Sequence, residues 1–145
     1  TFDTTADLAE MTSQIDADVC LVPAAIADFS PRKRKGKIPT REGAFTLDLE
    51  PTPKVLGAIR QATKGVVVGF KAEAEVTAAQ LKAKAIALRK ESDLDFVVAN
   101  DVARVKRDAT AITIVDRTGR STTFEGSKTD AAEHVGSALL HGVSG

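Results

Sequence analysis

The segment from Val19 to Pro39 combines residue types that favour the binding of a phosphorylated anion. An apolar run is followed by the small residues Ala24 and Ala25, and then by the carboxylate of Asp28. Five cations then fall within six residues, at 32–37. In open α/β sheets, ligands bind outside the carboxyl ends of buried strands, where positioned cations stabilise charge that develops on phosphorus. The segment therefore predicts a polyanion site.

Lys37 lies between Gly36 and Pro39, in a loop that can close over a bound anion. Closure would exclude water from a reactive intermediate. The structural alternative is a solvated loop lysine. Asp28 is a candidate to accept a ribose hydroxyl or to support Mg²⁺ through water, and its alternative is a turn cap. Ala24 and Ala25 would let backbone groups approach the nucleotide, although close packing explains them as well.

Gly69 and Phe70 end a second apolar run, Val66–Phe70, and are candidates for the same site. Gly69 would allow the backbone to contact the ligand, and Phe70 would line the cavity, unless both are ordinary core residues. His134 and His141 are expected at the surface. The sequence contains no zinc-ligand spacing, no phosphate-loop motif and no dinucleotide glycine fingerprint.

Strands and helices alternate along the chain. Hydrophobic periodicity and capping residues predict helices at 4–15, 53–63 (with Thr52 as N-cap) and 77–91, and a last helix opened by Ser127. They predict strands at 18–24, 44–50, 66–70 and 94–99, a loop at 29–43 and a hairpin over 111–125. Continuous apolar character in the first strand suits a sheet covered on both faces. The expected fold is a single α/β domain over 1–145, with a Rossmann-like, mostly parallel sheet, flanking helices and a C-terminal antiparallel hairpin.

Composition narrows the class of protein. The 145 residues carry 20 Lys+Arg and 20 Asp+Glu, so no general attraction to nucleic acid or to a membrane is indicated. The lone cysteine, Cys20, excludes an internal disulfide and is expected as inert core. No apolar run approaches 18 residues and no signal peptide is evident, so a cytoplasmic protein is expected. Because the chain begins at Thr1, we expect a piece of a longer protein.

Three ordered segments resemble one enzyme family. Ala24-Ala25-Ile26-Ala27-Asp28-Phe29 with Gly36-Lys37-Ile38, Val68-Gly69-Phe70-Lys71-Ala72-Glu73 and Asp95-Phe96-Val97-Val98-Ala99-Asn100-Asp101 resemble motifs of phosphopantothenoylcysteine synthetase. That ligase forms half of the bifunctional coenzyme A biosynthesis protein. The resemblance covers nearly the whole chain, with agreement in order and spacing.

The resemblance implies a homodimeric ligase that joins 4'-phosphopantothenate and cysteine. CTP and Mg²⁺ would activate the carboxylate as an acyl-cytidylate, and a decarboxylase domain is a possible fused or associated partner. By position, Lys37 matches the family's motif lysine near the α-phosphate, and this match favours a catalytic role over that of a solvated loop lysine. Asp28 matches the acid beside the nucleotide. Ala24, Ala25, Gly69 and Phe70 belong to the same nucleotide-binding segments.

Two departures from the family pattern leave alternatives open. The family's first strand, glycine-rich turn and Ser-Asn-x-x-Ser-Gly segment have no counterpart after Thr1, which predicts an N-terminally truncated domain. The family's long helix carries two nucleotide-facing lysines, for which Lys84 and Lys90 are the candidates. A truncated domain that binds nucleotide without activity is the first alternative, and a Rossmann-like oxidoreductase domain is the second.

Overall fold

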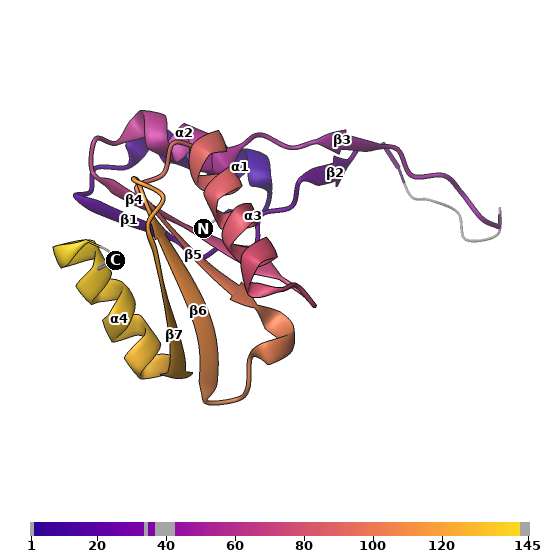
Figure 1. The fold of residues 1–145 in the computed structure, drawn as a ribbon. Helices are drawn as coiled ribbons and strands as arrows, with labels where there is room; N and C mark the ends of the chain where they lie inside the picture. The colour runs from indigo at the N-terminus through magenta and orange to yellow at the C-terminus, as the bar shows by residue number, and fades with distance from the viewer. Residues whose placement is uncertain (1, 34, 37–42, 143–145) are drawn as a thin grey trace.

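A computed structural model describes residues 2–33, 35–36 and 43–142, and its centre is a five-stranded sheet. The strand order is β1-β4-β5-β6-β7, with β1 at Val19–Val22, β4 at Val66–Glu73, β5 at Phe96–Asp101, β6 at Ala109–Asp116 and β7 at Ser121–Ser127. β1, β4 and β5 pair in parallel, and β6 and β7 form an antiparallel hairpin beside β5 (Figure 1). The predicted α/β fold with a C-terminal hairpin is confirmed.

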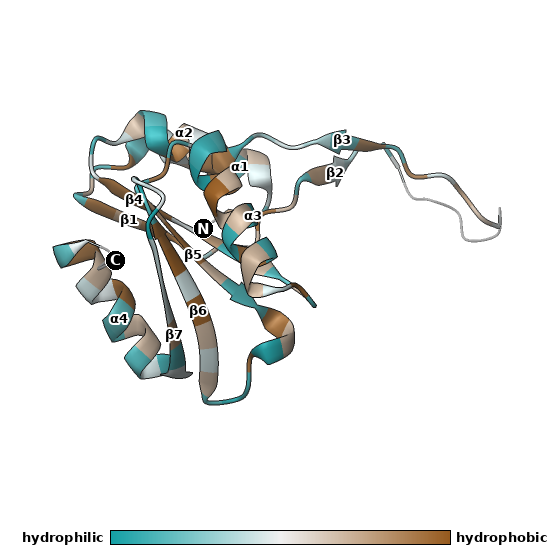
Figure 2. Cartoon of the chain, in the orientation of Figure 1, coloured by the Kyte–Doolittle hydropathy of each residue, from teal (hydrophilic) through white to brown (hydrophobic). Residues whose placement is uncertain are grey.

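Helices cover both faces of the sheet. The main helices are α1 at Thr5–Met11, α2 at Val55–Ala62, α3 at Ala78–Glu91 and α4 at Lys128–His141, with short 3-10 turns at Thr12–Gln14 and Val102–Arg104. Residues from α2 and α3 pack with Val67 and Val97 in one core cluster, whereas residues from α4 pack with Val68 and Val98 in another. Adjacent strand residues point to opposite faces, so the two clusters lie on the two sides of the sheet. Figure 2 shows hydrophobic residues gathered along these strands.

Side-chain caps begin three of the helices at the predicted places. The Thr4 hydroxyl accepts a hydrogen bond from the backbone of Asp7, whose carboxylate accepts one from the Thr4 backbone. Thr77 and Gln80 form the same reciprocal pair at α3, and Ser127 caps α4. These caps satisfy backbone donors that the first helical turn would leave unpaired.

The prediction that Thr52 caps α2 is wrong. α2 begins at Val55, and its N-cap residue, Lys54, makes no side-chain capping bond. The hydroxyl of Thr52 instead donates to the carbonyl oxygen of Ala27, and its backbone N–H donates to that of Asp28 over 3.0 Å. Thr52 therefore fastens the chain entering α2 to the chain leaving β1.

Residues 29–51 contain a separate two-stranded ribbon, where the sequence predicted a loop and then a strand at 44–50. β2, Phe29–Pro31, pairs antiparallel with β3, Leu49–Pro51. The ribbon projects away from the main sheet (Figure 1). Phe45 and Leu47 remain 57% and 48% exposed. Their alternating pattern predicted a half-buried strand, but no other described element covers this segment.

β1 is also less buried than predicted. Val19 and Leu21 are 48% and 51% exposed. β1 is an edge strand, and α4 packs on β6 and β7 at the other end of the sheet. A continuous apolar run therefore did not distinguish this edge strand from a central one.

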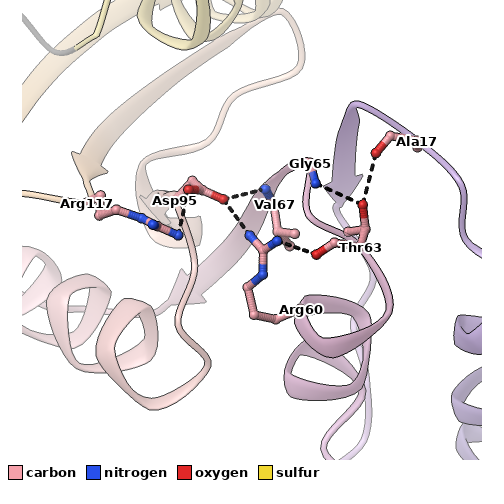
Figure 3. A network of polar contacts seen from close by, with 7 residues as sticks. All are labelled: Ala17, Arg60, Thr63, Gly65, Val67, Asp95 and Arg117. Atoms are coloured by element: carbon pink, nitrogen blue, oxygen red, sulfur yellow. Dashed lines mark hydrogen bonds and ion pairs between the residues drawn. The ribbon is translucent and has the colours of Figure 1, made fainter.

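A polar network joins the amino ends of β4 and β5 to α2 and to the hairpin turn. One Asp95 carboxylate oxygen accepts hydrogen bonds from the Arg60 guanidinium and the Val67 backbone, each over 2.8 Å, and the other pairs with Arg117 (Figure 3). The Thr63 hydroxyl accepts from Gly65 N–H and donates to the Ala17 carbonyl, each over 3.0 Å. Every polar atom of the Asp95 side chain is thus held.

Candidate functional site

A cavity of about 240 Å³ opens where β1 leads into the ribbon and α2 begins. Its lining comes from four segments: 22–28 after β1, 52–56 at the start of α2, 70–71 on β4, and 88–92 at the end of α3. The ordering of parallel strands brings these distant segments together. A cavity beside a strand's carboxyl end is where open α/β sheets place ligands.

Three of the predicted site residues line this one cavity: Ala24, Asp28 and Phe70. Asp28 is exposed and contributes a carboxylate, while Ala24 leaves room beside it. Phe70 also packs with the core cluster on the α4 side of the sheet. Asp28 and Phe70 therefore line one cavity, although Phe70 lies within β4 and not at its end as the sequence predicted.

Two other candidates lie differently. Ala25 is exposed but is not among the lining residues. Gly69 is buried, and a Cβ placed on it would lie 2.6 Å from Leu94 Cδ1, with Leu56 and Leu88 beside it. In the structure, the missing side chain of Gly69 makes room for leucines of the core. Roles for Ala25 and Gly69 in nucleotide binding stay predictions.

The lysine candidates are separated from the cavity or undescribed. Lys37 lies outside the described residues, so its catalytic role stays a prediction. Lys84 pairs with Glu73 and does not line the cavity. Lys90 is exposed on α3 and is also absent from the lining. The structure therefore does not bring Lys84 and Lys90 together with Asp28.

Sequence reasoning missed Lys54. Its ammonium lies 3.0 Å from the Asp28 carboxylate, and both residues line the cavity. The hydrogen bond from Lys54 to Asp28 raises the pKa of the lysine above its usual value. Thr52-Pro53 signalled a helix start here, and a helix start beside a strand's carboxyl end would have pointed to Lys54.

Lys71 and Glu91 are two further charged lining residues that the sequence did not single out. Lys71 lies on β4, which continues to Glu73 and is three residues longer than predicted. Glu91 ends α3, and its charge also raises the pKa of Lys54. From the residues that the structure describes, the cavity thus carries two lysines and two carboxylates, a set that suits a phosphorylated ligand with a divalent cation.

Within the described ranges, no three histidine, cysteine, aspartate or glutamate side chains form a cluster that would hold a metal ion. None of the described helices is long and apolar enough to cross a bilayer.

The fold and cavity define an α/β domain with a candidate ligand cavity beside the carboxyl end of its parallel strand β1. Residues 2–142 match the family described as DNA/pantothenate metabolism flavoprotein C-terminal domain. The chain belongs to that family.

Two curated relatives share part of the sequence. Both carry the name coenzyme A biosynthesis bifunctional protein CoaBC. The protein from Thermococcus kodakarensis is 32% identical over 102 residues, which cover 69% of this chain and 25% of the relative. The protein from Methanocaldococcus jannaschii is 33% identical over 90 residues, which cover 61% of this chain and 22% of the relative. The match spans about a quarter of the length of these relatives.

Solved structures share the fold at low identity. The DNA/pantothenate metabolism flavoprotein from Streptococcus pneumoniae has a TM-score of 0.84 at 20% identity, over 96% of this chain and 70% of that chain. A complex of the Cab2 H337A mutant with phosphopantothenate-cysteine has a TM-score of 0.72 at 21% identity, over 96% and 50%. The C-terminal domain of coenzyme A biosynthesis bifunctional protein CoaBC has a TM-score of 0.66 at 20% identity, over 97% of this chain and 63% of that chain.

Proposed function

We propose that this domain is the ligase part of a phosphopantothenate–cysteine ligase that uses CTP. In the first step, a carboxylate oxygen of 4'-phosphopantothenate attacks the α-phosphorus of CTP, and pyrophosphate leaves. In the second step, the amine of cysteine attacks the acyl carbon, and CMP leaves as the amide forms. Membership of the family and the cavity shared by Ala24, Asp28 and Phe70 support this proposal.

The cavity's charges suit a nucleoside triphosphate. Lys54 and Lys71 provide two ammonium groups, and the start of α2, which has no side-chain cap, also lines the cavity. Cations near the phosphates would reduce the repulsion between the triphosphate and the attacking carboxylate. Lys37 is expected to add a further cation next to the α-phosphate.

Mg²⁺ fits the same cavity. It is commonly held by one or two carboxylates together with substrate phosphates, and it keeps several waters. Asp28 and Glu91 both line the cavity and supply such carboxylates. When bound, Mg²⁺ would offset phosphate charge, and Asp28 would release Lys54 to contact the triphosphate.

Pyrophosphate release is the direct test of the proposed ligase. The chain is incubated with CTP, Mg²⁺ and 4'-phosphopantothenate, with and without cysteine, and pyrophosphate and the amide product are measured. Pyrophosphate that requires phosphopantothenate, with CMP and amide formed on adding cysteine, is the expected result. ATP and UTP in place of CTP test base selectivity. Binding of none of these nucleotides would contradict the proposal.

A nucleotide-binding domain without activity of its own is the second candidate. The match covers about a quarter of the CoaBC relatives, so the activity of those whole proteins is a proposal for this chain. The second candidate predicts saturable CTP binding without pyrophosphate release.

A homodimer and a fused or associated decarboxylase domain remain proposals from the family resemblance. The two CoaBC relatives are bifunctional by name, which supports the second. Sedimentation equilibrium over a range of chain concentrations would determine whether this chain forms dimers.

A further inference from the structure

Three charged side chains form a chain of contacts that ends at the cavity. Lys71 Nζ lies 3.0 Å from one carboxylate oxygen of Glu73, and Lys84 of α3 contacts the other oxygen. Glu73 is only 16% exposed, whereas Lys71 and Lys84 are 37% and 47% exposed. A nearly covered carboxylate therefore holds two lysines that both retain access to solvent.

The position of Lys71 on β4 directs its side chain to the face of the sheet that α2 and α3 cover. Lys71 lies two residues after Gly69 on the strand, so the two residues face the same side of the sheet. A Cβ on Gly69 would face Leu56 and Leu88 of those helices. Lys71 and both leucines line the cavity. Glu73 and Lys84 are not part of the lining, so the contacts run from outside the cavity to its wall.

The charge balance of this group matters for binding. A lone Glu73 beside Lys71 would cancel the lysine's charge and would also repel a phosphate. With Lys84 on its second oxygen, the group carries two positive charges and one negative charge. Lys84 therefore offsets Glu73, and the positive charge of Lys71 remains available to an anion in the cavity.

Lys71 also differs from the other cavity lysine in how firmly it is held. Lys54 pairs with Asp28, and both side chains are about 70% exposed. Such pairs in open solvent fix geometry weakly. Lys71 is held by a carboxylate that is mostly covered and has a second cationic partner, so less of its side-chain freedom remains to be lost when a ligand binds.

We propose that Lys71 is a phosphate-binding residue of the cavity and that Glu73 and Lys84 are positioning residues that hold its ammonium group there. This assignment rests on the proposed nucleotide-dependent function, and the ligand is the phosphate chain of a nucleoside triphosphate. It gives Lys84 an indirect role: the lysine acts on the nucleotide through Glu73 and Lys71.

Calorimetric titration of the 145-residue chain with CTP plus Mg²⁺, and separately with inorganic tripolyphosphate, tests the assignment. Lys71→Gln should weaken both ligands about tenfold or more, as expected for loss of a charge-assisted hydrogen bond. Lys71→Arg should recover part of the loss. Lys82→Gln removes the same charge from an exposed position on α3 and should leave both affinities nearly unchanged.

The positioning role of Lys84 is tested by coupling. Lys84→Gln should weaken binding in the wild-type background but cause no further loss in a Lys71→Gln background, because its effect passes through Lys71. Lys84→Arg, which keeps a cation for Glu73, should restore binding. An equal loss in both backgrounds would mean that Lys84 acts without Lys71 and would overturn its positioning role. Thermal melts of each variant check that it folds.

Two further outcomes separate this inference from the proposed function. If the wild-type chain binds CTP and tripolyphosphate while Lys71→Gln binds them equally well, the inference is wrong and the proposed function stands. If the wild-type chain binds neither ligand, both are overturned.

Discussion

The guanidinium of Arg60 donates to the carboxylate of Asp95 over 2.8 Å, which joins the last turn of α2 to the start of β5 (Figure 3). Both side chains are more than four-fifths buried. Asp95 also accepts from the Val67 backbone and pairs with Arg117, which is 57% exposed. The same carboxylate therefore links two adjacent strands, one helix and the hairpin turn.

Asp95→Ala should destabilise the fold far more than Arg117→Ala. Removing the carboxylate leaves the Arg60 charge and the Val67 N–H without their partner, at a cost of about 2–3 kcal/mol or more. Removing Arg117 deletes only a partly exposed ion pair, which contributes about 0–1 kcal/mol. Urea denaturation of the two variants measures the difference. Equal losses of stability would contradict the central role of Asp95.

Gly69, which is buried, and Gly65, which is half-buried, should respond differently to substitution by alanine. At Gly69 the new methyl group would meet Leu94 Cδ1 at 2.6 Å, and a side chain can shift. At Gly65 it would lie 2.3 Å from the Ala17 carbonyl oxygen, which is backbone. We expect Gly69→Ala to cost about 1–3 kcal/mol and Gly65→Ala to cost more. The reverse order of unfolding free energies would contradict the packing described for these positions.

Much of the fold could be predicted because its signals are local. Leu81 and Ala85 recur at helical spacing and form the buried stripe of α3, whose range the sequence predicted. The N-caps Thr4, Thr77 and Ser127 directly precede the helices that they begin, so each signal is local. The exposure of β1 could not be predicted from its composition, because burial depends on which elements lie beside a strand.

The site was predictable only in part, for a related reason. Asp28 and Phe70 come at the ends of apolar runs, and they meet because β1 pairs in parallel with β4 and ends beside Gly69. Lys54 and Glu91 reach the cavity because of where α2 and α3 cross the sheet, and Lys71 lines it from β4. No local spacing encodes those crossings, and each of these residues alone has the pattern of an ordinary surface charge.

Asp28→Asn should separate the magnesium effect from the lysine effect. With Mg²⁺ present, CTP affinity should fall about tenfold, because a carboxylate that supports the ion is lost. Without Mg²⁺, affinity should stay equal or rise, because Lys54 is freed from its partner and one negative charge leaves the cavity. Asp48→Asn, at an exposed position near the ribbon, is the matched control. A loss of the same size with and without Mg²⁺ would contradict this role.

Glu73 should make stability depend on pH in the acid range. Its hydrogen bonds with Lys84 and then Lys71 lower its pKa in the folded state. A lowered pKa stabilises the fold above the unfolded-state value, about 4.3 for glutamate, and this contribution is lost as pH falls through the folded-state pKa. The stability gap between wild type and Glu73→Gln should thus be full at pH 7 and close below about pH 4. Chemical denaturation across this range, repeated at high salt to test screening, measures the gap; a gap that widens on acidification would refute the assignment.

Lys37→Gln should abolish cysteine ligation while leaving the fold intact. The expectation rests on the sequence, in which Lys37 follows Gly36 within the segment that resembles the ligase motif. Loss of a cation beside the α-phosphate should lower the rate of pyrophosphate release by about a hundredfold or more, because charge develops there in the transition state. Lys35→Gln removes the same charge two residues earlier and should change the rate little, apart from weaker attraction of anions at low salt. Pyrophosphate release and thermal melts of both variants measure these effects, and equal rates for the two variants would remove the catalytic role from Lys37.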